Sequence, residues 1–153
     1  FQYLPYIRAE FAKAGLPQDL VWLAMVESQF HPRVTSRVGA GGMWQFMPST
    51  GKRFGLQITD ELDERYNWEK STKAAIEYLK ILHSQFGAWE LVVSAYNRGE
   101  GGIERVLAQA GGDTNWWRVM EHPEAGAHIP LETKEFYPKL LASIIVAKNP
   151  EKY

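Results

Sequence analysis

A glutamate at the end of an apolar segment is the first side chain of this sequence that is placed for acid–base chemistry. Residues 20–26 are apolar on every side, which indicates a helix buried around most of its circumference, and Glu27 directly follows them. Partial burial disfavours a charged carboxyl and the C-terminal end of a helix is negative, so both effects predict a raised pKa for Glu27. A carboxyl that stays protonated near neutral pH can act as a general acid in glycosidic bond cleavage. The alternative is a Glu27 that turns to water at the last helical turn.

The segment after Glu27 favours the chemical interpretation. Phe30, His31 and Pro32 end the helix, and residues 36–42 then form a glycine-dense loop. Such a loop exposes backbone N–H and C=O groups with few side chains in the way, so we expect it to allow close approach of a polymer chain. Loops on a helical scaffold are also where binding groups are most often mounted.

Four ordered segments of the chain carry a resemblance. They are Glu27-Ser28-Gln29-Phe30-His31-Pro32 followed by Ser36, Gly39-Ala40-Gly41-Gly42-Met43-Trp44-Gln45-Phe46-Met47-Pro48, Ala95-Tyr96-Asn97-Arg98-Gly99-Glu100-Gly101, and Ile129-Pro130-Leu131-Glu132-Thr133. Together they resemble the soluble lytic transglycosylase domain family, which is related to goose-type lysozyme, over nearly the whole chain. The Met43-Trp44-Gln45 form, with Ser49-Thr50-Gly51 and Pro138-Lys139, is most similar to the membrane-bound lytic murein transglycosylase D branch.

The resemblance implies a mainly α-helical, lysozyme-like domain with a substrate cleft, formed by residues 1–153 as one catalytic domain. Its implied substrate is the peptidoglycan glycan strand, with chito-oligosaccharides as related ligands, and the bond cleaved is the β-1,4 bond between N-acetylmuramic acid and N-acetylglucosamine. Glu27 takes the position of the catalytic glutamate. It would protonate the leaving oxygen and then deprotonate the muramic acid C6 hydroxyl, which closes a 1,6-anhydro ring without water.

The resemblance also implies a place in the bacterial periplasm or cell envelope. The chain begins without Met, so we expect it to be one domain of a longer protein. In that protein, a preceding segment would anchor it to the outer membrane, and wall-binding modules or protein partners would lie outside this fragment. The domain itself is not expected to insert into a membrane.

One carboxyl is chemically adequate for this reaction. Most glycosidases need two carboxyl groups, one of them as nucleophile or as base for water. An attacking hydroxyl within the substrate removes that need, because its proximity replaces much of the lost assistance. Two alternatives stay open: a lysozyme-type hydrolase that uses Glu27 with water, and a non-catalytic glycan-binding domain. The intact motif residues argue against a non-catalytic domain; they are Glu27, Gln45 and Asn97.

The remaining site residues are implied by the resemblance and each has a plainer alternative. Gln45 would hydrogen-bond a sugar beside the acid, or it is a capping or surface residue. Ser36 would orient the Glu27 carboxyl, or it caps its own loop. Tyr96 and Asn97 would line the cleft, or Asn97 caps a helix. Substrate contacts are also expected at Gly42 and Met43, in the same motif as Gln45.

One residue departs from the family pattern. The family has the Glu-Thr pair, here Glu132-Thr133, then two residues and then a tyrosine. This sequence has Phe136 at the place of that tyrosine, and the nearest tyrosine is Tyr137. A step of one residue turns about 100° on a helix, so Tyr137 does not simply replace the missing hydroxyl. Either Pro138 permits a shifted helix entry or the hydroxyl is dispensable.

The six tryptophans divide into two expected groups. Trp22, Trp68 and Trp89 lie within helical periods and are expected in the core. Sugars present apolar C–H faces that stack on exposed rings, so tryptophans near loops are better platform candidates. Trp44 leads this second group, together with one member of the adjacent pair Trp116 and Trp117.

Helices must position these residues, because the apolar period is helical nearly everywhere and no strand is expected. A short turn is expected within residues 113–120, and residues 36–42 and 121–130 are expected to be irregular. The expected helices cover residues 3–14, 17–29, 67–86, 88–98, 102–110 and 132–148.

Composition limits the remaining classes of function. The chain has 153 residues and a formal net charge of −1, which removes the signature of a general nucleic-acid binder. It has no cysteine, which excludes disulfides and thiol nucleophiles. The four histidines lack metal-site spacing, so no metal and no cofactor are expected. No apolar stretch reaches the ~18–20 residues of a transmembrane helix.

Overall fold

Helices account for nearly all the regular structure of the chain, as its apolar periodicity predicts. The computed structural model describes all 153 residues, and its only β-structure is a set of isolated bridges. The helices, with three short 3-10 helices labelled η, are α1 (Leu4–Lys13), η1 (Gln18–Trp22), α2 (Leu23–Ser28), α3 (Pro48–Arg53), η2 (Glu64–Tyr66), α4 (Trp68–Phe86), α5 (Trp89–Arg98), α6 (Glu100–Gln109), α7 (Trp116–Glu121), η3 (Gly126–His128) and α8 (Leu131–Lys148).

Most of the expected helices are confirmed within two residues, and three features differ. The segment 17–29 divides into η1 and α2, so only its second half is an α-helix. Helix α6 begins at Glu100, two residues early, because Gly99 turns the chain with a φ of 87° that favours glycine. Helix α3 was not expected. Pro48 begins it, since proline suits the first position of a helix, but its residues have no apolar period.

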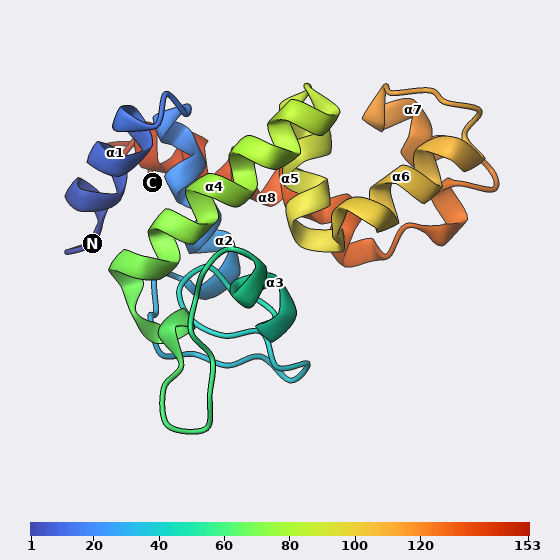
Figure 1. Cartoon of the computed structure of the whole chain (residues 1–153). Helices are drawn as coiled ribbons and strands as arrows, with labels where there is room; N and C mark the ends of the chain where they lie inside the picture. Colours follow the sequence, from blue (N-terminus) through green and yellow to red (C-terminus); the bar gives the residue numbers. More distant parts are fainter. The chain divides into compact units, whose positions relative to one another are not determined.

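The chain divides into two compact units, which we describe separately. Unit 1 comprises residues 1–78 and 143–153, and unit 2 comprises residues 79–142. Unit 1 therefore holds α1 to α3, the first half of α4 and the end of α8, and unit 2 holds α5 to α7 (Figure 1). The single domain expected from the sequence stays a prediction. No helix is long and apolar enough to cross a membrane.

Aromatic contacts join the elements of unit 1. Helix α1 packs on η1, and its Phe11 stacks on Trp44 with ring centroids 5.6 Å apart. The indole N–H of Trp44 donates to the Thr72 hydroxyl of α4 at 2.9 Å. Near the other end of this half of α4, Tyr78 packs against Phe54, 4.9 Å away. Residues far apart in the sequence thus meet around α4.

Two of the tryptophans expected in the core are only partly buried. Trp22 is buried as predicted, whereas Trp68 and Trp89 are half-buried. Trp68 packs against Tyr3, and Trp89 stacks on His83 with ring centroids 4.2 Å apart. Each indole therefore packs against a ring from another segment of the chain rather than filling the core.

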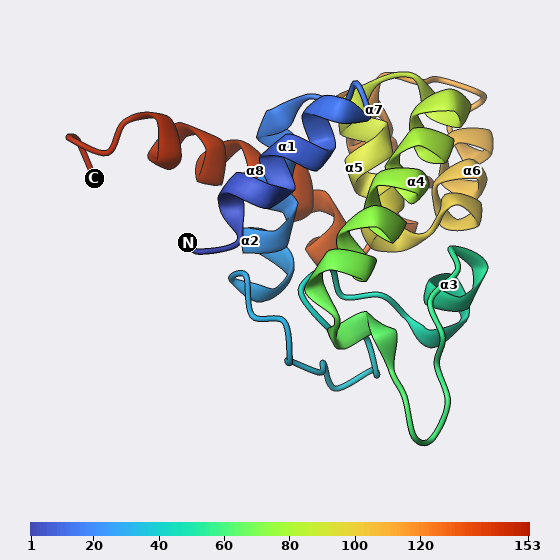
Figure 2. The same cartoon turned by 60° about the vertical axis from the view of Figure 1, so that its left-hand side comes forward.

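Unit 2 is built on α5, which packs on α6 and is buried along most of its length. Its last turn is joined to the start of α8 by Asn97. The Asn97 amide donates to Glu132 Oε1 at 3.0 Å, and the Thr133 hydroxyl donates to Asn97 Oδ1 at 2.8 Å. Helix α8 then continues through Pro138, and its last turns, coloured red in Figure 2, lie in unit 1.

A long connection joins α3 to α4 within unit 1, and both views show it as an extended loop (Figures 1 and 2). A bridge between Ile58 and Asp63 closes this loop. The buried Glu64 carboxylate accepts the backbone N–H of Gln57 at 2.8 Å and also pairs with the Lys70 ammonium. The Gln57 hydrogen bond and the Lys70 hydrogen bond and charge hold the pKa of Glu64 below its usual value.

We predict that Glu64→Gln makes the free energy of unfolding less dependent on pH in the acidic range. A carboxyl with a lowered pKa in the folded state contributes stability above its unfolded pKa of about 4.3, and that contribution is lost as the pH falls through the folded pKa. The free energy of unfolding, measured by denaturant titration between about pH 6 and 3, should therefore fall less steeply in the variant. Glu61→Gln, at an exposed carboxyl of the same loop, is the matched control. Equal slopes in Glu64→Gln and the parent would contradict this prediction.

Candidate active site

Glu27 lies in the last turn of α2 and is half-buried. The helix ends at Ser28 because the two residues that follow it, Gln29 and Phe30, both adopt the left-handed conformation, with φ of 54° and 60°. Their N–H groups donate to the carbonyls of Met25 and Ala24 at 3.0 and 3.1 Å, which closes the helix end. The Phe30 ring is buried and packs against Trp22, which holds the chain in this turn.

The residue after Glu27 fixes this helix end to the glycine-dense loop. The hydroxyl of Ser28 is buried and lies 2.7 Å from the Met43 carbonyl and 3.1 Å from the Ala24 carbonyl of its own helix. The hydrogen bond to Met43 joins two segments fifteen residues apart. It brings the turn that carries Glu27 close to the backbone just before Gln45. Ser28 belongs to the sequence motif that begins at Glu27, but nothing in the sequence indicates this role.

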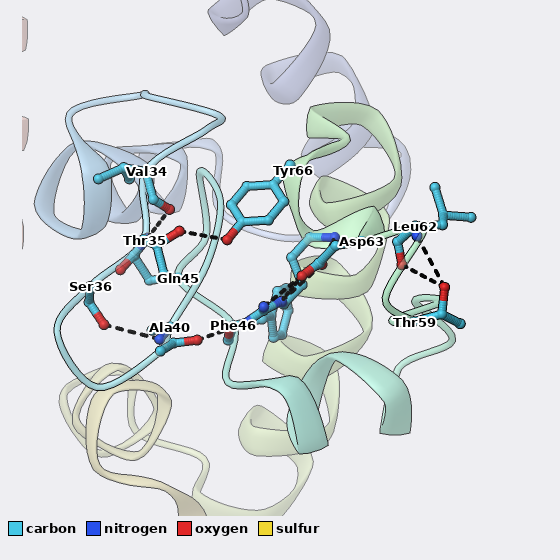
Figure 3. A network of polar contacts seen from close by, with 12 residues as sticks. Val34, Thr35, Ser36, Ala40, Gln45, Phe46, Thr59, Leu62, Asp63 and Tyr66 are labelled. Carbon is cyan, nitrogen blue, oxygen red and sulfur yellow. Dashed lines mark hydrogen bonds and ion pairs between the residues drawn. The ribbon is translucent and has the colours of Figure 1, made fainter.

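Residues 34–46, which we name the Gln45 loop, form a compact turn made by their own backbone (Figure 3). Gly41 and Phe46 exchange two hydrogen bonds of 2.9 and 3.1 Å, and the Gly42 N–H donates to the Val34 carbonyl at 2.9 Å. The Ser36 hydroxyl accepts the Ala40 N–H at 3.0 Å. Ser36 therefore has the loop-capping role that the sequence left open as the alternative to orienting Glu27.

Gln45 lies on this loop with its amide held in one orientation. Its side-chain nitrogen donates to the Gly42 carbonyl at 2.8 Å and to the Val34 carbonyl at 3.3 Å (Figure 3). Because both contacts are carbonyls, the nitrogen end of the amide is assigned by its partners. The half-buried side chain is left with its oxygen as the acceptor for a ligand O–H or N–H group.

Backbone strain is concentrated in the same region. Gln29, Phe30 and Gln45 are the only non-glycine residues of the chain with a positive φ. The left-handed conformation costs on the order of 1–2 kcal/mol for such a residue. Strain of this kind persists where the surrounding structure enforces it, and it clusters at functional sites. Two of these residues follow Glu27 closely and the third lies within the Gln45 loop, which indicates a candidate site there.

The prediction of Trp44 as an exposed sugar platform is wrong, whereas the substrate contact expected at Met43 stays a prediction. Both side chains are fully buried. The Trp44 ring is stacked on Phe11 and its N–H is bonded to Thr72, so it offers neither a face nor a donor to a ligand. The glycine-dense residues before Trp44 favoured the prediction of an exposed ring, whereas residues of α1 and α4 enclose that ring.

The glycines of the loop also have a purpose that the sequence did not indicate. A Cβ on Gly42 would lie 1.9 Å from the backbone oxygen of Arg65, and one on Gly41 would lie 3.0 Å from the Arg65 guanidinium carbon. The N–H and C=O of Gly42 are both used by hydrogen bonds within the loop. These two glycines therefore admit another segment of the chain, and the contact to substrate expected at Gly42 stays a prediction.

In unit 2, the predicted residues Tyr96, Asn97 and Tyr137 have separate surroundings. Tyr96 is buried, and the Asn97 amide bridges α5 to α8 rather than capping its own helix. Tyr137 is half-buried, and burial, with a smaller effect from the Glu90 charge, raises its pKa. The departure from the family pattern persists in space, because Phe136 is buried in the core of the unit and Tyr137 is not.

The adjacent pair Trp116 and Trp117 behaves as the sequence predicts, with one member on the surface. Trp116 is fully buried, whereas Trp117 is 46% exposed. The Trp117 ring lies 6.1 Å from that of Tyr137, with a tilt of 53° between their planes. The two rings form the exposed aromatic surface of unit 2.

An open cavity of about 460 Å³ lies beside the Gln45 loop in unit 1 and is lined by Arg33, Asp63, Tyr66 and Asn67. The Tyr66 hydroxyl shares a 2.6 Å hydrogen bond with the Thr35 hydroxyl at the start of the loop (Figure 3). The lining offers hydroxyl, amide and guanidinium groups, which suits a polar ligand. No group of three or more His, Asp or Glu side chains is arranged to hold a metal ion.

The chain matches a family model described as "Transglycosylase SLT domain" over residues 5–118. It is 37% identical over 155 residues to "Membrane-bound lytic murein transglycosylase D" of Escherichia coli (strain K12). That alignment covers 99% of this chain and 32% of the relative. The chain is also 39% identical over 104 residues to "Peptidoglycan transglycosylase gp16" of Escherichia phage T7, which covers 65% of this chain and 8% of that protein. This chain thus spans about a third of the length of the first of these relatives.

The fold is similar to the X-ray structure of an inactive glutamate-to-glutamine mutant of the lytic transglycosylase Slt from Pseudomonas aeruginosa. The TM-score is 0.70 at 24% sequence identity, over 95% of this chain and 23% of that chain. This likeness confirms the mainly α-helical, lysozyme-like fold class expected from the sequence.

We predict that Trp44 contributes to stability and not to ligand stacking. Trp44→Phe should lower the free energy of unfolding by about 1 kcal/mol through loss of the bond to Thr72. Trp44→Ala should lower it by about 3–5 kcal/mol, because it also leaves a cavity against Phe11. Denaturant titration measures both, with Trp117→Ala as the control at a 46% exposed tryptophan, for which we expect a smaller loss than for Trp44→Ala. A stable Trp44→Ala protein with weakened glycan binding would restore the platform role.

Proposed function

We propose that this chain, which belongs to the transglycosylase SLT domain family, is a peptidoglycan lytic transglycosylase that acts through Glu27. The observation that carries the proposal is the half-buried Glu27 in the last turn of α2, beside a loop that presents the Gln45 amide oxygen. The names of the relatives support the substrate class, since they refer to murein and peptidoglycan. The structural neighbour is inactive as a glutamate-to-glutamine mutant, which supports a reaction that depends on one glutamate.

The position of Glu27 suits the first step of the reaction. The partial burial of Glu27 and its place at the negative C-terminal end of α2 both favour the protonated carboxyl. Glu27 gives its proton to the glycosidic oxygen, and the bond from that oxygen to C1 of N-acetylmuramic acid breaks. The N-acetylglucosamine side leaves with a free hydroxyl. By the family resemblance, the acetamido oxygen of the muramic acid residue steadies the positive charge at C1.

The second step restores the acid. The Glu27 carboxylate takes the proton of the C6 hydroxyl, and the C6 oxygen bonds to C1 of the same sugar to close the 1,6-anhydro ring. Glu27 is protonated again and no water is consumed. The attacking oxygen belongs to the bound sugar, so its high effective concentration supplies assistance that a second carboxyl gives in other glycosidases.

Gln45 is the substrate contact that we assign in unit 1. Two backbone carbonyls hold the nitrogen end of its amide, so its oxygen can accept a hydrogen bond from a sugar N–H or O–H without a prior change of rotamer. In unit 2 we assign sugar stacking to the exposed Trp117 and to Tyr137. Asn97 then supports the glycan site indirectly, since it positions the start of α8.

We place this activity in the bacterial cell envelope, where peptidoglycan lies. The name of the relative from Escherichia coli (strain K12) describes a membrane-bound protein, and this chain corresponds to about a third of that protein. Anchoring to the outer membrane and attachment of wall-binding modules would belong to other parts of such a protein.

We predict that Glu27→Gln slows the cleavage of purified peptidoglycan by about 10²- to 10⁴-fold, because the amide can neither donate the proton nor take one back. Mass spectrometry of the digest should show products of the parent enzyme one water molecule lighter than hydrolysed ends. Glu61→Gln, at an exposed carboxyl, controls for the loss of one negative charge.

Two outcomes of this experiment count against the proposal. Products that carry the additional water and reducing ends would indicate a lysozyme-type hydrolase on the same fold. A Glu27→Gln protein that cleaves as fast as the parent would remove Glu27 from the mechanism.

A further inference from the structure

Arg65 is a buried cation whose three guanidinium nitrogens each donate to a partner within unit 1. It lies in η2 with its side chain only 8% exposed. Its Nη1 donates to the Gly39 carbonyl at 2.7 Å and to the Phe46 carbonyl at 3.0 Å. Its Nε and Nη2 donate to the two Asp63 carboxylate oxygens at 3.0 and 2.6 Å. One guanidinium therefore joins both ends of the segment 39–46 to the loop before α4.

The Gln45 loop is shaped around this guanidinium. A side chain at Gly41 would press on Arg65, and one at Gly42 would overlap its backbone oxygen. Tyr66, the next residue, reaches the first part of the loop through its hydrogen bond to Thr35 (Figure 3). Residues of η2 thus hold the loop at three points: Thr35, Gly39 and Phe46.

Stability alone does not account for an arginine at this position. A buried ion pair loses its hydration, and replacing such a pair with well-packed apolar residues is often neutral or stabilising. An arginine, by contrast, provides a rigid planar fork that can satisfy several acceptors in fixed directions at once. The role that requires this residue is therefore geometric, and the geometry it fixes is that of the loop carrying Gln45.

We propose that Arg65 is a positioning residue that holds the Gln45 loop so that the Gln45 amide oxygen faces the glycan. This inference rests on the proposed function. The path is short, because the Phe46 carbonyl that accepts from Arg65 belongs to the residue after Gln45. Phe46 in turn exchanges hydrogen bonds with Gly41, next to the Gly42 carbonyl that holds the Gln45 amide. Asp63 also takes part in this positioning, because its carboxylate accepts hydrogen bonds from Nε and Nη2 of the guanidinium.

The first test is a double-mutant cycle between Arg65→Lys and Gln45→Leu, measured as the KM and kcat for soluble glycan strands. A lysine keeps the charge but has no planar fork, so it cannot serve Asp63 and both carbonyls together. We expect Arg65→Lys to raise KM about tenfold with a smaller effect on kcat, because Gln45 binds the sugar in the ground state as well. In the Gln45→Leu background the same change should have little further effect, since the group that it misplaces is gone.

The second test does not depend on cleavage. In the parent protein, the Gln45 side-chain N–H₂ group should give one pair of proton NMR signals, and these protons should exchange slowly with water, since two carbonyls hold the group. Arg65→Lys should shift these signals and speed the exchange, whereas Arg37→Lys, at an exposed arginine of the same loop, should leave both unchanged. Asp63→Asn is the second variant, with a smaller effect in the same direction, should Arg65→Lys unfold.

The outcomes separate this inference from the proposed function. A parent protein that cleaves no peptidoglycan would overturn the function, and the NMR comparison would still decide whether Arg65 orients Gln45. An Arg65→Lys effect of equal size with and without Gln45 would show a merely structural role and overturn the inference. An unchanged Gln45 resonance in a folded Arg65→Lys or Asp63→Asn protein would overturn it as well.

Discussion

The end of helix α2 is the constraint on which the rest of the candidate site depends. Glu27 can stay half-buried there only if the chain turns away immediately after it, and two consecutive non-glycine residues accept the left-handed conformation to make that turn. The burial of Phe30 against Trp22 offsets this strain, with ring centroids 5.8 Å apart. The turn then delivers the chain to the Gln45 loop, to which Ser28 ties it through the Met43 carbonyl. The acid and the acceptor are therefore parts of one connected piece of backbone.

The fold could be predicted from the sequence to a large extent, because most of its helices show an apolar period and several are followed by a glycine. Helices α1, α4, α5 and α8 follow directly from apolar spacing and from turn residues such as Gly87. Helix α3 could not be found in this way, since a single turn and a half beginning at Pro48 has no period to detect. Gly99 was recognised as the end of one helix, but not as a corner from which the next begins at once.

The site was predicted less completely, because its shape depends on contacts between residues distant in sequence. Glu27 and Gln45 were named from their local motifs. Trp44 was placed on the surface because it follows a glycine-dense loop, whereas Phe11 and Thr72 enclose it from 33 and 28 residues away in the sequence. The glycines were interpreted as room for a polymer, and the sequence did not indicate that two of them, Gly41 and Gly42, make room for Arg65. A signal for that pair existed in the spacing Asp63-Glu64-Arg65, which allows a carboxylate and a guanidinium to meet across a short turn, but nothing local indicates which loop they hold.

The central claim of this account is that the sugar's own hydroxyl, and not water, attacks C1 after Glu27 has released the leaving group. Digestion of peptidoglycan in water enriched in oxygen-18, followed by mass spectrometry of the new chain ends, tests this claim most directly. We predict that the new ends carry no heavy oxygen, because every oxygen atom in them comes from the substrate. One heavy oxygen atom for each bond cleaved would contradict the claim and identify water as the nucleophile.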